Sequence, residues 1–173
     1  MKKVLLLLLV SASISVSLSA QSNYKSAIGG RLGTTPYDIL SFSYKSFITT
    51  QGALEFNAGF GSKNYYHGNN HDNTFTLSGA ISYQHHFKIK PVEGLQWFIG
   101  GGLAIYNTFS DYDDYHGFGF GIFPTGGIDY KFPGIPLNVT VDGRPTIMVT
   151  GPNNHESLYH NLGLAARYTL GGK

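Results

Sequence analysis

The last stretch of the chain, residues 161–170, alternates between apolar residues and small or polar ones. Because successive side chains of a β-strand point to opposite faces, this period of two predicts a strand with two different faces. One face consists of Leu162, Leu164, Ala166, Tyr168 and Leu170, and the other of Asn161, Gly163, Ala165, Arg167 and Thr169. Such a strand needs a partner on each edge, an apolar medium on one side and a polar filling on the other. A closed barrel in a membrane provides all three.

Seven earlier stretches show the same alternation, and no segment shows a sustained helical period. They lie at residues 24–34, 39–47, 54–60, 75–87, 95–106, 117–131 and 137–147, and we expect Pro145 at a β-bulge. Turn-forming or polar residues occupy the breaks at 35–38, 49–52, 61–73, 88–94, 107–115, 133–136 and 151–157. The sequence therefore predicts an all-β fold, an eight-stranded antiparallel up-and-down transmembrane β-barrel.

The chemistry of the two faces distinguishes a membrane barrel from a soluble one. A secreted, lipocalin-like calyx of eight strands would enclose its large apolar residues around a ligand and expose its polar face to water. Here the large residues are almost all on one face, and the other face carries Gly, Ala, Ser, Thr and Asn with isolated charges. Small and polar residues suit a narrow lumen, so the membrane barrel is the favoured reading and the calyx a remote alternative.

The amino terminus has the pattern of a secretory signal peptide. Lys2 and Lys3 precede an apolar run at residues 4–10, and small residues follow up to Ala20, the expected cleavage point. A membrane anchor is the alternative, but the strongly apolar part is shorter than the ~20 residues that a spanning helix needs. We expect a signal peptide at residues 1–20 and a single barrel domain at residues 21–173.

Composition excludes several kinds of chemistry. The chain has no cysteine, which removes disulfides and thiolate-bound metals. Its formal net charge of +2 is too small to favour nucleic acid as a partner. With 23 glycines and 14% aromatic residues it fits aromatic-rich strands interrupted by glycine.

The lengths of the breaks predict an orientation. If both termini are periplasmic, the breaks near Thr49, Lys88 and Phe132 are the inner turns, and these are short. Three of the four remaining breaks are longer and polar, as the outward loops of such barrels are. We therefore expect a multi-pass protein of the outer membrane with both termini in the periplasm.

Three segments carry a resemblance to a known family: Ala-Ile-Gly-Gly-Arg-Leu-Gly at 27–33, Val-Asp-Gly-Arg-Pro at 141–145 and Ala-Ala-Arg-Tyr at 165–168. In these segments, and in the strand pattern around them, the chain resembles the small outer-membrane β-barrel proteins of the OmpA and OmpX type. The resemblance implies the eight-stranded barrel and an outer-membrane location. It says little about activity, because such barrels share a structure and differ in role.

Charged residues on the lumen-facing side form the most informative group. They are Arg31, Lys45, Glu55, Asp129, Asp142, Arg144 and Arg167. A gated ion path is one reading, but at eight strands we favour a plug of paired charges that fills a narrow lumen. If the last hairpin folds around residues 152–154, Asp142 and Arg167 lie at matching depth, and we expect them to form a salt bridge.

The outward loops are the candidate contact surface. Exposed tyrosine mixed with asparagine and aspartate resembles protein contact surfaces. The candidate residues are Tyr65, Tyr66, His67, His71, Asp111, Asp113, Asp114 and Tyr115. We expect a structural or adhesive role, with another cell surface or a protein as the partner, although the loops could simply shield the barrel mouth.

No motif predicts a metal, a cofactor or a catalytic group. Five histidines lie in or near the loops with Asp72, Asp113 and Glu156, but no two have a spacing that would preorganise a metal site. A lipid A-modifying enzyme, which needs a serine and a histidine base, is the main alternative function beside a narrow channel. His86 shares a face with Ser82, but four residues of strand separate them, which is beyond hydrogen-bond reach. We therefore expect a protein that is not an enzyme.

The closing strand also resembles the signal that barrel assembly machinery recognises, through Leu162, Leu164, Tyr168 and Leu170. It departs from that signal because residues 171–173 follow the last apolar residue. With the apolar face toward outer-membrane lipid, Leu164→Arg should reduce the folded fraction sharply and Arg167→Gln only slightly.

Overall fold

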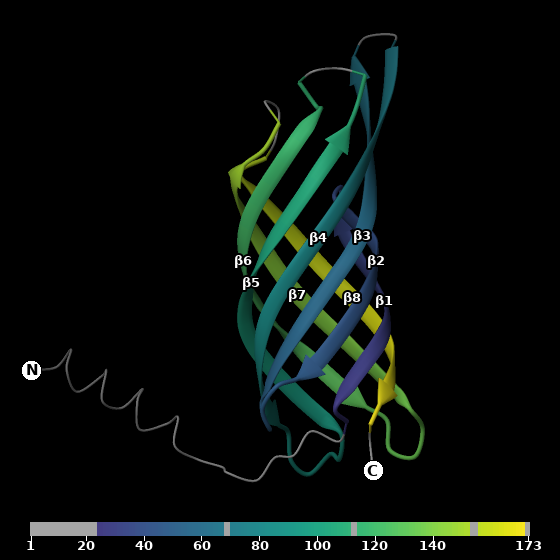
Figure 1. The fold of residues 1–173 in the computed structure, drawn as a ribbon, viewed down its shortest axis with the longest axis vertical. Coiled ribbons are helices and arrows are strands. Elements are labelled where there is room, and N and C mark those ends of the chain that lie inside the picture. Colours follow the sequence, from purple (N-terminus) through teal and green to yellow (C-terminus); the bar gives the residue numbers. More distant parts are fainter. Residues whose placement is uncertain (1–23, 68–69, 112–113, 153–155, 172–173) are drawn as a thin grey trace, which may run out of the picture.

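The computed structural model describes residues 24–67, 70–111, 114–152 and 156–171, which form a closed barrel of eight antiparallel strands (Figure 1). The strands are β1 (Ser26–Thr35), β2 (Asp38–Phe47), β3 (Gly52–His67), β4 (Asn70–Lys88), β5 (Leu95–Phe109), β6 (Gly117–Lys131), β7 (Leu137–Thr150) and β8 (Leu158–Leu170). The predicted fold class is confirmed. The expected signal peptide lies outside the described residues.

Each strand pairs with its neighbours in sequence, and β1 pairs with β8 to close the barrel. This last pairing runs from Ser26 opposite Leu170 to Gly33 opposite Gly163. Closure matters because a strand edge in contact with lipid would leave backbone N–H and C=O groups without partners. None of the described residues forms a helix with the length and hydropathy needed to cross a bilayer.

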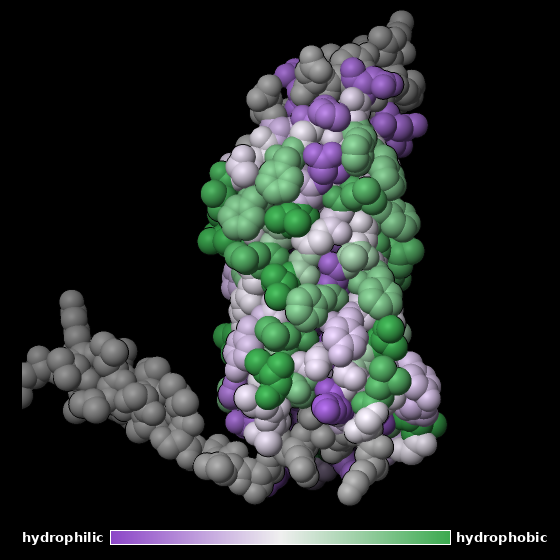
Figure 2. All heavy atoms as spheres, viewed as in Figure 1, coloured by the Kyte–Doolittle hydropathy of each residue, from purple (hydrophilic) through white to green (hydrophobic). Residues whose placement is uncertain are grey.

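The two faces of the strands are those that the alternation predicts. On β8, for example, Leu164 is 50% exposed on the outer surface, whereas Arg167 is 1% exposed in the lumen. Hydrophobic side chains cover much of the barrel wall in Figure 2, and hydrophilic ones gather at its upper end. The calyx alternative is therefore wrong, because the barrel encloses its charges and exposes its large apolar residues.

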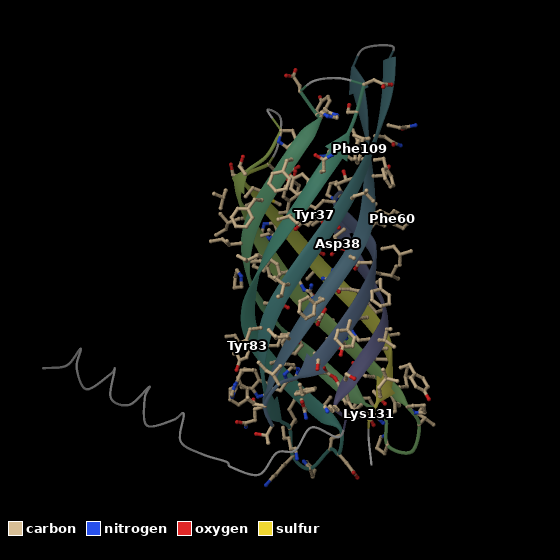
Figure 3. All side chains as sticks on the ribbon, in the orientation of Figure 1. Tyr37, Asp38, Phe60, Tyr83, Phe109 and Lys131 are labelled. Atoms are coloured by element: carbon tan, nitrogen blue, oxygen red, sulfur yellow. The ribbon has the colours of Figure 1, made fainter. Side chains whose placement is uncertain are left out.

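Aromatic residues mark both ends of the apolar wall. Phe60, Phe75 and Phe109 stack in a row near one end, with ring centroids 6.2 and 6.4 Å apart (Figure 3). Near the other end Trp97 stacks on Phe87 at 4.3 Å. On β5, Trp97 and Phe109 are twelve residues apart. At ~3.3 Å per residue and a tilt of ~40° this gives roughly 30 Å of height, comparable with the aromatic-flanked band of membrane barrels.

The predicted polar break at 61–73 is wrong, because most of it is strand. β3 and β4 continue their pairing from Gly61 opposite Thr76 to His67 opposite Asn70. Beyond the wall a ribbon is solvated on both faces, so its sequence need not alternate between apolar and polar residues. The predicted break at 107–115 likewise begins too early, since β5 runs to Phe109.

The expected bulge at Pro145 is also wrong. Pro145 keeps its regular place opposite His160 of β8. On its other side the pairing of β6 with β7 is regular at Ile122 opposite Ile147 and again at Gly126 opposite Gly143, which places Pro124 opposite Pro145. Proline has no backbone N–H, so two facing prolines remove both donors at this point. The hydrogen bonds between β6 and β7 are interrupted there, but the register is the same on both sides. The irregularity in this pairing lies instead between Phe120 and Gly121.

A charge in the middle of the outer wall should destabilise the barrel in a depth-dependent way. We expect Leu164→Arg to cost ~2–4 kcal/mol of folding free energy, because the guanidinium would enter the apolar band. Leu170→Arg, at the end of the same strand, should cost only ~0–1 kcal/mol. The folded fraction on a heat-modifiability gel measures both. Equal losses would contradict the position of the apolar band.

Candidate functional site

Among the described residues, four positively charged and four negatively charged side chains lie in the lumen, each on a residue less than 10% exposed. They are Arg31, Lys45, Arg144 and Arg167 on one side and Asp38, Glu55, Asp129 and Asp142 on the other. Seven of these are the residues that the sequence identifies as lumen charges, and Asp38 is the eighth. The formal charges therefore cancel, as a desolvated interior requires.

Arg31 organises the section of the lumen nearest to the β1–β2 turn. Its Nη1 donates to Asp38 at 2.5 Å, while Nη2 and Nε donate to the two carboxylate oxygens of Asp142 at 2.7 and 3.1 Å. Asn161 also donates to Asp38, at 3.2 Å. Gly163 is necessary here, because a Cβ atom at this position would overlap the Arg31 guanidinium. The bidentate contact fixes β1 to β7 across the barrel.

Glu55 is the centre of the middle section. Its Oε1 lies 2.6 Å from Nη2 of Arg144 and 2.9 Å from Nη2 of Arg167. Gln84 donates to the other oxygen at 2.8 Å. Arg144 also lies 2.9 Å from Asp142, which links this section to Arg31. A single carboxylate on β3 thus contacts side chains from β4, β7 and β8.

Asp129 holds the section nearest to the chain termini. It forms an ion pair with Lys45 and accepts a hydrogen bond from Asn138. Nε2 of His86 lies 3.4 Å from the same carboxylate, and the Tyr24 hydroxyl donates to it at 3.4 Å. Asn138 in turn accepts from Arg167 at 3.4 Å, so the inner and middle sections are joined.

Aromatic residues flank this network at both ends. Toward the outer loops Tyr37 stacks on Tyr106 at 5.3 Å and meets Tyr159 edge-on at 5.4 Å. The cavity above them measures about 30 Å³, which is about the share of one water molecule. Toward the termini Phe47 meets both Tyr24 and His86. The charged side chains are therefore enclosed between two groups of aromatic residues, and they form ion pairs with one another.

The expected salt bridge between Asp142 and Arg167 is wrong. Asp142 lies opposite Gly163, and Arg167 lies opposite Asn138, so the two are four residues out of register. The hairpin does centre between residues 152 and 153, because Asp142 pairs with Gly163 and Ile147 with Leu158. A hairpin folded around residues 152–154 therefore places Asp142 opposite Gly163, and the expectation matched it with a residue four positions too far along β8.

Sequence reasoning missed Asp38 and the position of His86. Asp38 follows Pro36 in what reads as a turn, so its inward direction was not visible from alternation. His86 was considered only as a base for Ser82, but it faces Asp129, while the Ser82 hydroxyl lies 3.4 Å from Gln84. Its place on the polar face of β4 was the available signal.

The predicted loop contacts are only partly described. Asp111 and Asp114 are exposed, and Tyr115 is half-buried against the mouth cavity. Tyr65, Tyr66 and His67 fall on β3 and His71 on β4, but their side chains lie outside the described part of the structure, as does Asp113 entirely. Within the described residues no three His, Cys, Asp or Glu side chains gather as metal ligands would.

The residues of the predicted assembly signal lie on the outer face of β8. Leu162, Leu164, Tyr168 and Leu170 are all at least 40% exposed there. Their alternation with buried residues is unbroken from His160 to Leu170. The structure therefore presents them on the surface that faces lipid in a membrane barrel.

Comparison with solved structures supports the fold. The chain is similar to the N-terminal β-barrel domain of Pseudomonas aeruginosa OprF, with 21% identity and a TM-score of 0.51 over 87% of this chain and 98% of that domain. It is also similar to Ail, the attachment invasion locus protein of Yersinia pestis, with 10% identity and a TM-score of 0.46 over 85% and 99%. No family model matches the chain, and no curated protein sequence matches it. The fold is thus that of an eight-stranded outer-membrane barrel.

Removing the central carboxylate should leave two arginines with too little negative charge. We expect Glu55→Gln to lower the free energy of unfolding by ~3–5 kcal/mol, and Arg167→Gln by a similar amount, which revises the slight effect expected from the sequence. The double variant should lose less than the sum, because both members of one pair are removed. Urea unfolding in vesicles, followed by the fluorescence of the single tryptophan, measures this.

The control is Lys63→Gln, which breaks the ion pair of Lys63 with Glu156 at the outer rim. That pair spans 3.3 Å and is partly solvated, so its loss should cost less than ~1 kcal/mol. Additive losses at Glu55 and Arg167 would mean that the two side chains act independently.

Proposed function

We propose that the protein is an integral outer-membrane barrel without catalytic activity, which contacts another cell surface or a protein through the end of the barrel opposite its termini. The observation that carries the proposal is the extension of β3 and β4 beyond the rest of the wall (Figure 1). The supports for membrane position, orientation, lack of catalysis and contact surface are independent of one another.

The outer wall supports the membrane position. Large apolar side chains, aromatic at both ends, surround a closed backbone ladder, and the charges are inside. A continuous apolar exterior of this kind is unfavourable in water, and exposed apolar patches on soluble proteins seldom exceed a few hundred Å². Lipid is therefore the first partner that we propose.

Loop geometry supports periplasmic termini. The turns on the same side as the termini, at residues 48–51, 89–94 and 132–136, are short. On the opposite side lie the extended ribbon and the connections at 110–116 and 151–157. Short periplasmic turns and longer extracellular segments are the rule in bacterial outer-membrane barrels.

The lumen supports a role other than catalysis or conduction. Its charges are committed to ion pairs with one another, and Phe98 and Phe123 each lie against one cation, Lys45 and Arg144. A channel would need a continuous path for water, and an enzyme would need a nucleophile within reach of a base. Ser43 does donate to Glu55 at 3.4 Å, but two arginines already share that carboxylate. His86, a possible base, faces Asp129 and not a serine.

The ribbon supports the contact function. β2 pairs with β3 only as far as Phe60, and β5 pairs with β4 only as far as Phe75. Above these residues both outer edges of the ribbon carry backbone groups without a neighbouring strand, which is a ready template for binding another chain. The acidic connection with Asp111 and Asp114 lies at the same end.

For assembly, we propose that the outer face of β8 is the surface read by the barrel assembly machinery. The supporting feature is its unbroken alternation of exposed and buried residues up to Leu170. No nucleic-acid partner and no cofactor are part of the proposal.

Shortening the ribbon should abolish surface contact without unfolding the barrel. We expect replacement of residues 64–73 by an Asn-Gly turn, which keeps Lys63 opposite Thr74, to reduce adhesion of expressing cells to the level of cells without the protein. The wall should stay intact, because its pairing ends at Phe60 and Phe75. Heat-modifiability and the amount in the outer membrane are the controls. The matched variant Asp111→Asn with Asp114→Asn tests the acidic loop alone. Unchanged adhesion in the ribbon variant would favour loops that only shield the mouth.

The protein should change neither the structure of lipid A nor the conductance of a bilayer. We expect mass spectra of lipid A to be identical in cells with and without it, and planar bilayers containing it to show no discrete conductance steps. An added or missing acyl chain would make the protein an enzyme, and regular steps would make it a channel.

A further inference from the structure

Four lysines gather at the end of the barrel where the described chain begins and ends (Figure 3). Lys88 is the last residue of β4 and Lys131 the last of β6, and both continue the lumen-facing side of their strands. They therefore lie at the mouth of the lumen and not on the lipid-facing wall. Lys25 immediately precedes β1, and Lys90 lies in the turn between β4 and β5. We call these four lysines the inner rim.

Backbone hydrogen bonds join the segments that carry the inner rim. The N–H of Lys131 donates to the carbonyl of Gly94, in the β4–β5 turn, at 2.9 Å. In the turn between β6 and β7, the carbonyl of Pro136 accepts from Thr169 of β8 at 3.0 Å. The N–H of Lys25 donates to the last residue of β8 at 3.2 Å. These contacts connect the four lysines through neighbouring segments, so the inner rim is one continuous surface.

The positive charge of the inner rim is not neutralised within the described residues. None of its lysines forms an ion pair there, and the three turns at this end contain a single carboxylate, Glu93. Asp129, the lumen carboxylate at this end, already pairs with Lys45. The Nζ of Lys131 donates to two carbonyls of the β6–β7 turn, which hold the ammonium group without cancelling its charge. An acidic partner would supply the missing negative charge.

Two exposed aliphatic side chains lie among these lysines. Val92 follows Lys90 by two residues and is 48% exposed, and Ile135, whose carbonyl binds Lys131, is 49% exposed. Both lie in turns, beyond the ends of the strands that form the apolar wall. Apolar side chains bordered by charges of one sign suit contact with a protein segment that carries the opposite charge.

We propose that the inner rim, together with Val92 and Ile135, is a docking surface for an acidic segment of another protein. Carboxylates of that segment pair with the lysines, and aliphatic side chains between the carboxylates pack on Val92 and Ile135. The exposed aliphatic residues favour a protein over a polyanion that offers charge alone. The inference rests on the proposed function for its compartment, because periplasmic termini direct this surface to a periplasmic partner.

The test measures peptide binding to the folded barrel in phosphatidylcholine nanodiscs, which add no net charge of their own. The probes are fluorescent peptides of alternating Glu and Leu, of Glu and Ser, and of Gln and Leu, with empty nanodiscs as the blank. Fluorescence anisotropy should show the tightest binding for the Glu–Leu probe, weaker binding for the Glu–Ser probe and none for the Gln–Leu probe. Added salt should weaken the binding of both acidic probes.

Variants separate the charged part of the surface from the apolar part. Changing Lys25, Lys88 and Lys90 together to Gln should weaken binding of the Glu–Leu probe by up to about five-fold per lysine, and changing them to Arg should preserve it. Lys131 stays in place because its Nζ binds the turn carbonyls. Val92→Ser with Ile135→Ser should weaken binding of the Glu–Leu probe but not of the Glu–Ser probe. Lys63→Gln, at the opposite end, is the matched control and should change nothing.

Three outcomes would overturn the proposal. The first is equal binding of the Glu–Leu and Gln–Leu probes, and the second is equal losses in the Lys63 variant and the triple lysine variant. The third is an unchanged affinity of the Val92 and Ile135 variant for the Glu–Leu probe while soluble cell-wall fragments compete as strongly as that probe. This last result would leave a surface that binds polyanions without recognising a protein. Heat-modifiability confirms that each variant is folded before its binding is measured.

Orientation is tested separately with single cysteines, since the chain contains none of its own. A membrane-impermeant maleimide should label Asp111→Cys on intact cells and Lys90→Cys only after the outer membrane is permeabilised. Labelling of Lys90→Cys on intact cells would refute the periplasmic termini while leaving the nanodisc result intact. Absence of probe binding together with the expected labelling would refute the docking surface alone.

Discussion

The ion pairs of Glu55 with Arg144 and Arg167 are the interaction on which the rest of the lumen depends. Two guanidinium groups share one carboxylate in an interior that excludes water. Without Glu55, Arg167 would lose its carboxylate partner, and Arg144 would keep only Asp142, which also pairs with Arg31. Through Asp142 the arginines connect to Arg31, and through Asn138 they connect to Asp129. One connected network thus spans the length of the barrel interior and touches strands that are far apart in sequence.

A second constraint is the need of every backbone N–H and C=O group for a hydrogen-bond partner. It applies in the apolar wall but not in the ribbon above it. Within the wall every strand has two neighbours, and apart from the interruption at Pro124 and Pro145 the backbone ladder pairs the polar groups without water. Above Phe60 and Phe75 that requirement ends, because the ribbon leaves the apolar band. The same two strands therefore have neighbours on both edges within the apolar band and free outer edges above it, where we propose the contact surface.

Alternation along the chain predicted the strands and their faces because lipid and lumen demand opposite chemistry on successive residues. It could not predict which charges meet across the lumen: Asp142 pairs with Arg31 of β1, and Arg167 pairs with Glu55 of β3. Such contacts depend on the closure between β1 and β8, a contact of high sequence separation that no local pattern encodes. The ribbon was missed for a related reason: outside the apolar band, strand and loop sequences have the same polarity.

The facing prolines on β6 and β7 make the wall mechanically uneven. Pro124 pairs regularly with Gly101 on one side and Pro145 with His160 on the other, so the missing donors concentrate on the single seam between them. The small outward residues Gly126 and Gly143 lie next along that seam and add little side-chain cohesion. We therefore expect mechanical or thermal unfolding to begin with separation of β6 from β7. The backbone amides between these two strands should exchange with solvent before those between the other strand pairs.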